Sequence, residues 1–114
     1  MLTIRRAKSA EIKKTSFIVN IGASIMGMVD QNYIQNRIEA AEKGKAEALY
    51  DLGILYSIGH GVEQDNIEAH KWFNLAAMRG MISAQVDRAE LADLMSNMEI
   101  SEAQRKAREW IVTH

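Results

Sequence analysis

The chain has 114 residues, of which 47% are hydrophobic and 25% charged, as expected for one globular domain with a single core. It contains no cysteine, which excludes disulfide scaffolds, thiolate metal sites and cysteine nucleophiles. Its formal net charge of −1 argues against non-specific binding to nucleic acid. It also contains no proline, a residue that interrupts helices, and this absence predicts a chain of successive helices.

Residues 1–29 combine a basic head with an apolar run. Residues 1–15 carry a net charge of +4, and the run at 17–29 is apolar except at Asn20, Gly22, Ser24 and Gly27. The run is shorter than the roughly 20 residues of a membrane span, which argues against a transmembrane helix. Three interpretations stay open: a packing helix, a targeting signal, or a wrongly assigned start. The packing helix would place on one face Phe17, Ile21, Ile25 and Met28.

Residues 30–43 predict a single helix that forms half of a repeat unit. Asp30 is placed to cap it, and Ile34, Ile38 and Ala41 share its apolar face. About three helix pairs are usually needed for a stable stack, and the chain supplies roughly two. We therefore expect the half-unit and a helix within 1–29 to complete the core. Deletion of residues 1–29 should then destabilise the domain or change its oligomeric state.

An internal repeat organises the rest of the chain. The residues at 40–44 (AAEKG) return 36 positions later at 76–80 (AAMRG), and Ala48 and Ala84 keep that offset. Farther on, Ala69 aligns with Ala103 at an offset of 34, so the second unit has lost two residues. The repeat predicts a first unit at 44–80 and a divergent closing unit at 81–114.

The first unit is predicted to be a pair of helices. The helix at 45–58 has an apolar stripe at Leu49, Leu52, Gly53 and Tyr56. The two glycines of Gly59-His60-Gly61 end it, and Asp65 with Glu68 forms a capping box for a second helix, which Gly80 closes. The inner stripe of that second helix is Ala69, Trp72, Phe73, Ala76 and Ala77.

The closing unit is predicted to be a second helical hairpin. Ser96 and Glu99 form another capping box, which opens a final helix. Its inward residues are Ile100, Ala103, Ala107, Trp110 and Ile111. The expected fold is therefore all-α, a short α-solenoid of antiparallel helix pairs with an additional N-terminal helix.

Catalytic and metal-binding patterns are missing from the sequence. Its three histidines, His60, His70 and His114, have no metal-ligand spacing, so no metal and no cofactor are expected. Glu102 and Lys106 fit an exposed ion pair, and the other helical carboxylates, read as solvated faces, are Glu39, Glu42, Asp87 and Glu90. No nucleophile, base and orienting group stand together, and we expect no enzyme.

The stretch AEALYDLGILYSIGHGVEQDNIEAHKWFNLAAMRG at 46–80 resembles a Sel-one-like repeat, a relative of the tetratricopeptide repeat. The resemblance is carried by the Leu-Gly pair, the Gly-x-Gly-Val turn, Asp65 and the Ala-x-x-Trp element, all in register. Residues 81–112 are similar but divergent, with Ala89 in place of Gly53 and Lys106 in place of Trp72. Residues 1–29 resemble nothing in the family.

The resemblance implies an α-solenoid that acts as a non-catalytic adaptor between proteins, often in bacterial signalling, envelope or secretion systems. In such repeats the first helix of each pair lines a concave partner-binding face. The corresponding positions here are Glu47, Tyr50, Ile54, Ser57, Ser83, Val86, Glu90 and Asp93. Tyr50 and Ile54 are of most interest, because they place an aromatic and an aliphatic side chain one turn apart.

The function expected is protein–protein interaction with an unidentified partner protein in the cytoplasm. A homo-oligomer formed through the N-terminal helix is a further expectation. The alternative is an exported, periplasmic or membrane-associated envelope accessory protein that uses its basic and apolar N-terminal segment.

Overall fold

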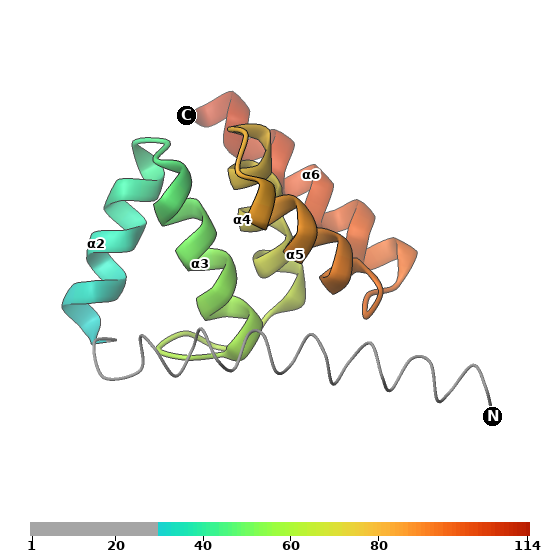
Figure 1. Cartoon of the computed structure of the whole chain (residues 1–114), viewed down its shortest axis with the longest axis horizontal. Coiled ribbons are helices and arrows are strands. Elements are labelled where there is room, and N and C mark those ends of the chain that lie inside the picture. Colours follow the sequence, from blue (N-terminus) through green and yellow to red (C-terminus); the bar gives the residue numbers. More distant parts are fainter. Residues whose placement is uncertain (1–29) are drawn as a thin grey trace.

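The computed structural model describes residues 30–114, which form five helices and no strand (Figure 1). The helices are α2 (Gln31–Glu42), α3 (Ala46–Ile58), α4 (Asn66–Met78), α5 (Ile82–Ala92) and α6 (Asn97–Thr113). The all-α prediction is confirmed. The additional N-terminal helix was expected within residues 1–29, which lie outside the described residues. None of the helices between residues 30 and 114 is long and apolar enough to cross a membrane.

Side chains and glycines set the helix ends largely as the sequence predicts. The Asp30 carboxylate accepts from the backbone N–H of Tyr33, 2.8 Å away, and caps α2. Ser96 and Glu99 form the complete capping box of α6. The helix breaks coincide with positive φ angles at Gly44, Gly59, Gly61 and Gly80. At Gly59 a Cβ would also lie 2.7 Å from Cβ of Gln64, so the turn after α3 excludes a side chain there.

Helix α4 is the centre of the described domain. It packs against α3, α5 and α6, and α2 packs on the far side of α3. Successive helices run antiparallel, which gives a short stack of helix pairs (Figure 1). The second pair differs from the first, because α5 and α6 are held mainly by α4 and less by each other.

Two apolar clusters form the core. One is centred on α2, α3 and α4 around Leu49, Leu52, Leu55, Leu75 and Ala76, and it also includes Ala84 of α5 and Ala107 of α6. The other brings α3, α4, α5 and α6 together through Ile54, Ala69, Phe73, Leu91 and Ala103. Gly53 lets α3 approach α4 closely, since a Cβ at this position would lie 2.4 Å from Cδ1 of Phe73. Small residues at the helix contacts and large ones beside them therefore fill the space between the helices.

The outer face of α2 is polar, and charged pairs cover much of the outer face of α6. Exposed residues of α2 include Gln35, Asn36, Glu39 and Glu42. On α6 the guanidinium of Arg105 binds both Glu102 and Glu109. Ile111 was expected to face inward, and this was wrong: it is 42% exposed. The reason is length, because α6 has 17 residues against 13 in α4 and its last turn extends past the end of that helix (Figure 1).

Candidate functional site

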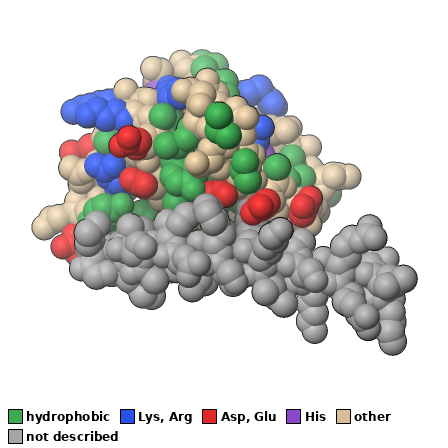
Figure 2. Space-filling view, viewed as in Figure 1, with side chains coloured by type: hydrophobic (Ala, Val, Ile, Leu, Met, Phe, Trp, Pro, Cys, Tyr) green, Lys and Arg blue, Asp and Glu red, His purple; other side chains and the backbone are tan. Residues whose placement is uncertain are grey.

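The first helices of the two units, α3 and α5, lie in front of α4 and α6 and form one face of the domain (Figure 1). We call it the α3–α5 face; it contains the residues that the sequence assigned to partner binding. Figure 2 shows this side of the molecule, where hydrophobic side chains gather in the middle and acidic ones lie beside them.

A hydrogen bond between Tyr50 and Asp87 joins the two helices of this face. The Tyr50 hydroxyl donates to Oδ2 of Asp87, 2.6 Å away, and the Tyr50 ring lies 5.6 Å from the Phe73 ring between centroids. Burial and the Asp87 carboxylate both raise the pKa of the Tyr50 phenol. Asp87 is only 2% exposed, so its expected place on a solvated helix face was wrong. Tyr50 therefore fixes α3 relative to α5.

Ile54 is in the core and not on the surface. It is 2% exposed and packs in the cluster that contains Phe73 and Leu91. Its expected place on the partner face was therefore wrong. The sequence of α3 shows one clear apolar stripe, whereas α3 packs on both α2 and α4 and is apolar on more than one side. A helix with neighbours on several sides lacks the broad polar face of a surface helix.

The remaining candidate residues differ in exposure. Glu47, Ser83, Val86 and Asp93 are exposed, and Ser57 and Glu90 are half-buried. The Ser57 hydroxyl donates to the carbonyl of Gly53 at 2.8 Å, so its hydrogen bond stays within α3. Of these residues, the α3–α5 face exposes Glu47 on one helix and Ser83, Val86 and Asp93 on the other.

Sequence reasoning missed Ile82, which is the more exposed of two apolar side chains on this face. Ile82 is 72% exposed and Val86 51%. They lie one turn apart at i and i+4, on the side of α5 opposite its buried residues Ala84, Asp87 and Leu91. The i, i+4 spacing to Val86 was the signal that could have found Ile82.

The structural residues of the first unit lie at the contacts between helices. Leu52, Ala69, Ala76 and Ala77 are buried, and Tyr56 is half-buried beside the second cluster. The Trp72 ring meets Trp110 of α6 edge-on, with 6.2 Å between centroids, and Lys71 Nζ lies 4.0 Å from the Trp72 ring centroid. Trp72 thereby links α4 to the closing helix.

Glu68 has a different role from the one its capping-box position predicts. Asp65 accepts from the backbone N–H groups of Ile67 and Glu68, but the Glu68 carboxylate binds Lys71 at 2.9 Å and Lys106 at 3.2 Å. Burial disfavours the ionised Glu68, yet Lys71 and Lys106 more than offset burial and lower its pKa. The capping-box expectation for Glu68 was therefore wrong.

The expected surface pair of Glu102 with Lys106 was also wrong. Lys106 reaches across to α4 and Glu68, and Glu102 binds Arg105 on its own helix. Lys106 stands where the first unit has Trp72. The closing unit thus replaces an aromatic contact at this position with an ion pair between α4 and α6.

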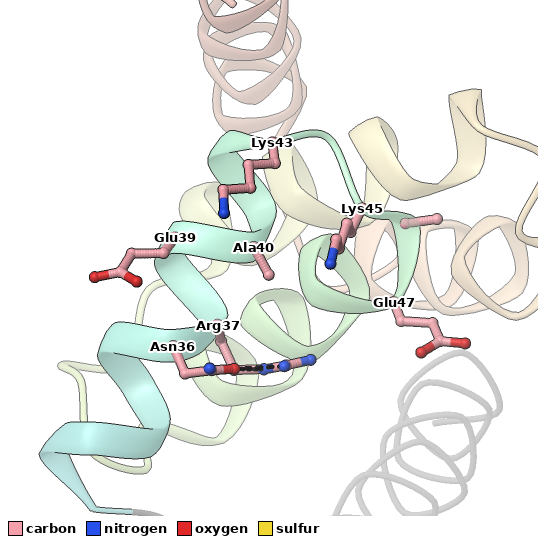
Figure 3. A pocket seen from close by; sticks show the side chains of 8 residues that line it. Asn36, Arg37, Glu39, Ala40, Lys43, Lys45 and Glu47 are labelled. Carbon is pink, nitrogen blue, oxygen red and sulfur yellow. Dashed lines mark hydrogen bonds between the residues drawn. The ribbon is translucent and has the colours of Figure 1, made fainter.

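An open cleft lies between the last turns of α2 and the first turn of α3. Its volume is about 620 Å³, and its walls include the side chains of Arg37, Glu39, Lys43, Lys45 and Glu47. Figure 3 shows Lys43 and Lys45 on opposite sides of the cleft and Arg37 beside Asn36. These charges of both signs are on exposed or half-buried side chains, which is typical of a solvated groove between two helices.

Arg37 also joins α2 to α3. Its Nη1 lies 3.2 Å from Oδ2 of Asp51. Burial raises the pKa of the Asp51 carboxyl, and the hydrogen bond and charge of Arg37 counteract part of that rise. Among residues 30–114 no three His, Asp or Glu side chains lie close enough together to hold a metal ion.

Comparison with known proteins agrees with the repeat seen in the structure. Residues 46–81 match the Sel1 repeat family, the family that residues 46–80 resemble. The match covers α3, the turn at Gly59 and Gly61, and α4. No curated protein gave a significant match. Sel1 repeats generally mediate protein–protein interactions and are typically non-catalytic.

Proposed function

We propose, from the Sel1 repeat at residues 46–81, that this chain is a non-catalytic adaptor that binds a partner protein on the α3–α5 face. The observation that carries the proposal is the pair Ile82 and Val86, which are 72% and 51% exposed one turn apart on α5. Such neighbouring apolar side chains are the usual anchors of a protein interface, because covering them removes apolar surface from water.

The surroundings of the pair support this assignment. Glu47 and Ser83 are exposed polar residues of the same face, as expected at the rim of an interface. The Tyr50–Asp87 hydrogen bond holds the two helices in one arrangement, so the surface is formed before the partner arrives. A preformed surface avoids part of the entropy lost on binding. Tyr50 thus contributes to the site as a positioning residue beneath it.

The test is affinity capture with paired variants of the full chain. Ile82→Ser together with Val86→Ser should abolish capture of the proteins that the wild-type chain retains. The matched control is Met98→Ser together with Val112→Ser, because both of these apolar residues are exposed and lie on α6. The control should capture the same proteins as the wild type.

Stability decides how the result is interpreted. All four substitutions are at exposed positions, so the melting temperatures should stay close to that of the wild-type chain. Capture that is unchanged by the Ile82 and Val86 substitutions, or lost only in the α6 control, would show that the α3–α5 face is not the binding surface. The membrane-associated alternative depends on residues 1–29, and no contact within residues 30–114 favours it.

A further inference from the structure

Beyond the partner surface, we propose that the chain's own N-terminal segment, residues 5–29, docks across the C-terminal ends of α3 and α5. The start of α2 and the ends of α3 and α5 lie along the same edge of the domain (Figure 1). Asp30 caps the start of α2, so the segment joins the domain at this edge. Ile82 and Val86 lie in the first half of α5 and Glu47 at the start of α3, away from this edge.

The edge is acidic and the segment is basic. Residues 46–70 and residues 89–104 contain no lysine or arginine. The first stretch has five carboxylates and the second has four. Figure 2 shows acidic side chains along this edge. By sequence, Glu63 lies in the turn after α3, and Glu90 and Asp93 lie at the end of α5. Residues 1–15 carry a net charge of +4. The C-terminal ends of α3 and α5 add partial negative charge from the helix dipole, which also attracts cations.

The order of chemical types along the segment matches their order along the edge. Counting back from Asp30, the apolar run at 17–29 comes first and the basic residues at 5–14 follow. Moving from α2 along the edge, the half-buried Ile58 at the end of α3 comes first, and the acidic end of α5, with Glu90 and Asp93, follows. Apolar residues would therefore meet apolar ones, and lysine and arginine would meet carboxylates.

The length of the segment fits this path. Neighbouring helices pack about 8–10 Å apart. The 13 residues at 17–29 would span about 20 Å as a helix, which carries the chain from the start of α2 past the end of α3. The basic residues then reach the end of α5, where Leu94 is an exposed apolar side chain beside the carboxylates. This docking shares Glu90 and Asp93 with the α3–α5 face. It leaves Ile82 and Val86, which carry the proposed function, uncovered in the first half of α5.

The test uses paramagnetic labels on the full chain, which has no native cysteine. A nitroxide on Ser9→Cys should broaden the amide NMR signals of Asp93 and Leu94 and leave those of Ile82 and Ser83 sharp. A nitroxide on Met26→Cys, on the side of a helical wheel away from Phe17, Ile21 and Met28, should broaden the end of α3. Glu90→Gln with Asp93→Asn should remove the broadening from the Ser9 label. Glu42→Gln with Glu47→Gln changes the net charge equally at the opposite edge and should leave it in place.

Three results would overturn the proposal. The first is an absence of broadening at the end of α5, or broadening that the Glu42 and Glu47 control removes equally well. The second is broadening seen only when labelled chains are mixed with nitrogen-15 chains that carry no label, which would assign the segment to a second copy. The third is sedimentation of the chain with anionic vesicles and no broadening in their absence, which would assign the segment to a membrane surface.

Discussion

The hydroxyl of Tyr50 on α3 donates a hydrogen bond of 2.6 Å to the carboxylate of Asp87 on α5, 37 residues later in the chain. The two residues belong to successive units, and the bond joins the two helices of the α3–α5 face. Asp87 is almost fully buried, where a carboxylate is costly unless it accepts hydrogen bonds. The contact therefore stabilises the stack and also sets the relative position of the two helices that form the candidate binding face.

Tyr50→Phe should lower the free energy of unfolding by about 1–3 kcal/mol, because it removes a donor from a buried carboxylate and keeps the aromatic packing. Urea unfolding of the full chain measures this. Tyr33→Phe is the matched control, since no hydrogen bond to the Tyr33 hydroxyl exists among the described residues. Equal midpoints for Tyr50→Phe and the wild type would show that the bond contributes nothing to stability.

The same bond should make stability depend on alkaline pH. The pKa of Tyr50 is raised in the folded chain, first by burial and then by Asp87. A group with a raised folded pKa stabilises the protein fully below its unfolded pKa, about pH 10 for tyrosine. The stability difference between wild type and Tyr50→Phe should be constant below about pH 10 and shrink as the pH rises above it. Unfolding curves at several alkaline pH values test this, and a constant difference throughout would contradict it.

Gly53→Ala should destabilise the chain although alanine favours helices. The new Cβ would lie 2.4 Å from Cδ1 of Phe73, so α3 and α4 must separate. Overpacking of this kind costs about 1–3 kcal/mol, which outweighs the roughly 1 kcal/mol gained from helix propensity. The control is Ala89→Gly at the equivalent but exposed position of α5, which should cost only that propensity. Thermal unfolding compares the two; a more stable Gly53→Ala variant would show that the contact is loose.

Glu68→Gln should lower stability at pH 7 and have a smaller effect in acid. The folded pKa of Glu68 is lowered, because Lys71 and Lys106 outweigh the effect of burial, so its contribution is present above an unfolded pKa of about 4.5 and is lost as the pH falls below it. At pH 7 the free energy of unfolding should fall by more than the value of an exposed ion pair, about 1 kcal/mol. It should fall by less than the cost of breaking a buried pair, about 3 kcal/mol.

The control for Glu68 is Glu102→Gln, which removes a pair with Arg105 that is much more exposed than the Glu68–Lys71 pair and should change stability little. Urea unfolding at pH 7 and at pH 3 gives the comparison. An effect of Glu68→Gln that is the same at both pH values would mean that its charge is unimportant and that the loss comes from packing.

Ala76→Leu should overpack the first core cluster. Ala76 is fully buried on α4, and leucine adds volume that the neighbouring helices cannot accommodate without moving. We expect a loss of about 1–3 kcal/mol in the free energy of unfolding. Ala89→Leu makes the same change at an exposed position and should be close to neutral. If both variants unfold at the wild-type urea concentration, Ala76 is not at a close helix contact.

Much of the fold could be predicted because its signals are local. Asp30, Asp65 and Ser96 cap helices with backbone groups two or three residues away, and glycines at positions 44, 59 and 80 end helices through their own φ angles. The candidate site was predicted less well. Glu47, Ser83, Val86 and Asp93 are exposed as expected, but Ile54 is buried and Ile82 was overlooked. The exposure of a side chain depends on how many helices pack around its own helix, and the periodicity of that helix does not show this.

By itself, the sequence determined the helices, their ends, the repeat of about 36 residues and the all-α class, because these follow from backbone propensity, capping and glycine within a few residues. Only the tertiary structure decided which polar groups are buried and paired. Asp87 accepts a hydrogen bond from Tyr50, and Lys106 binds Glu68 on α4. The Glu68 carboxylate therefore does not cap α4. These partners lie 37 or 38 residues apart in sequence. They meet because α4 brings α3, α5 and α6 together, and that packing depends on the shapes of all four helices at once.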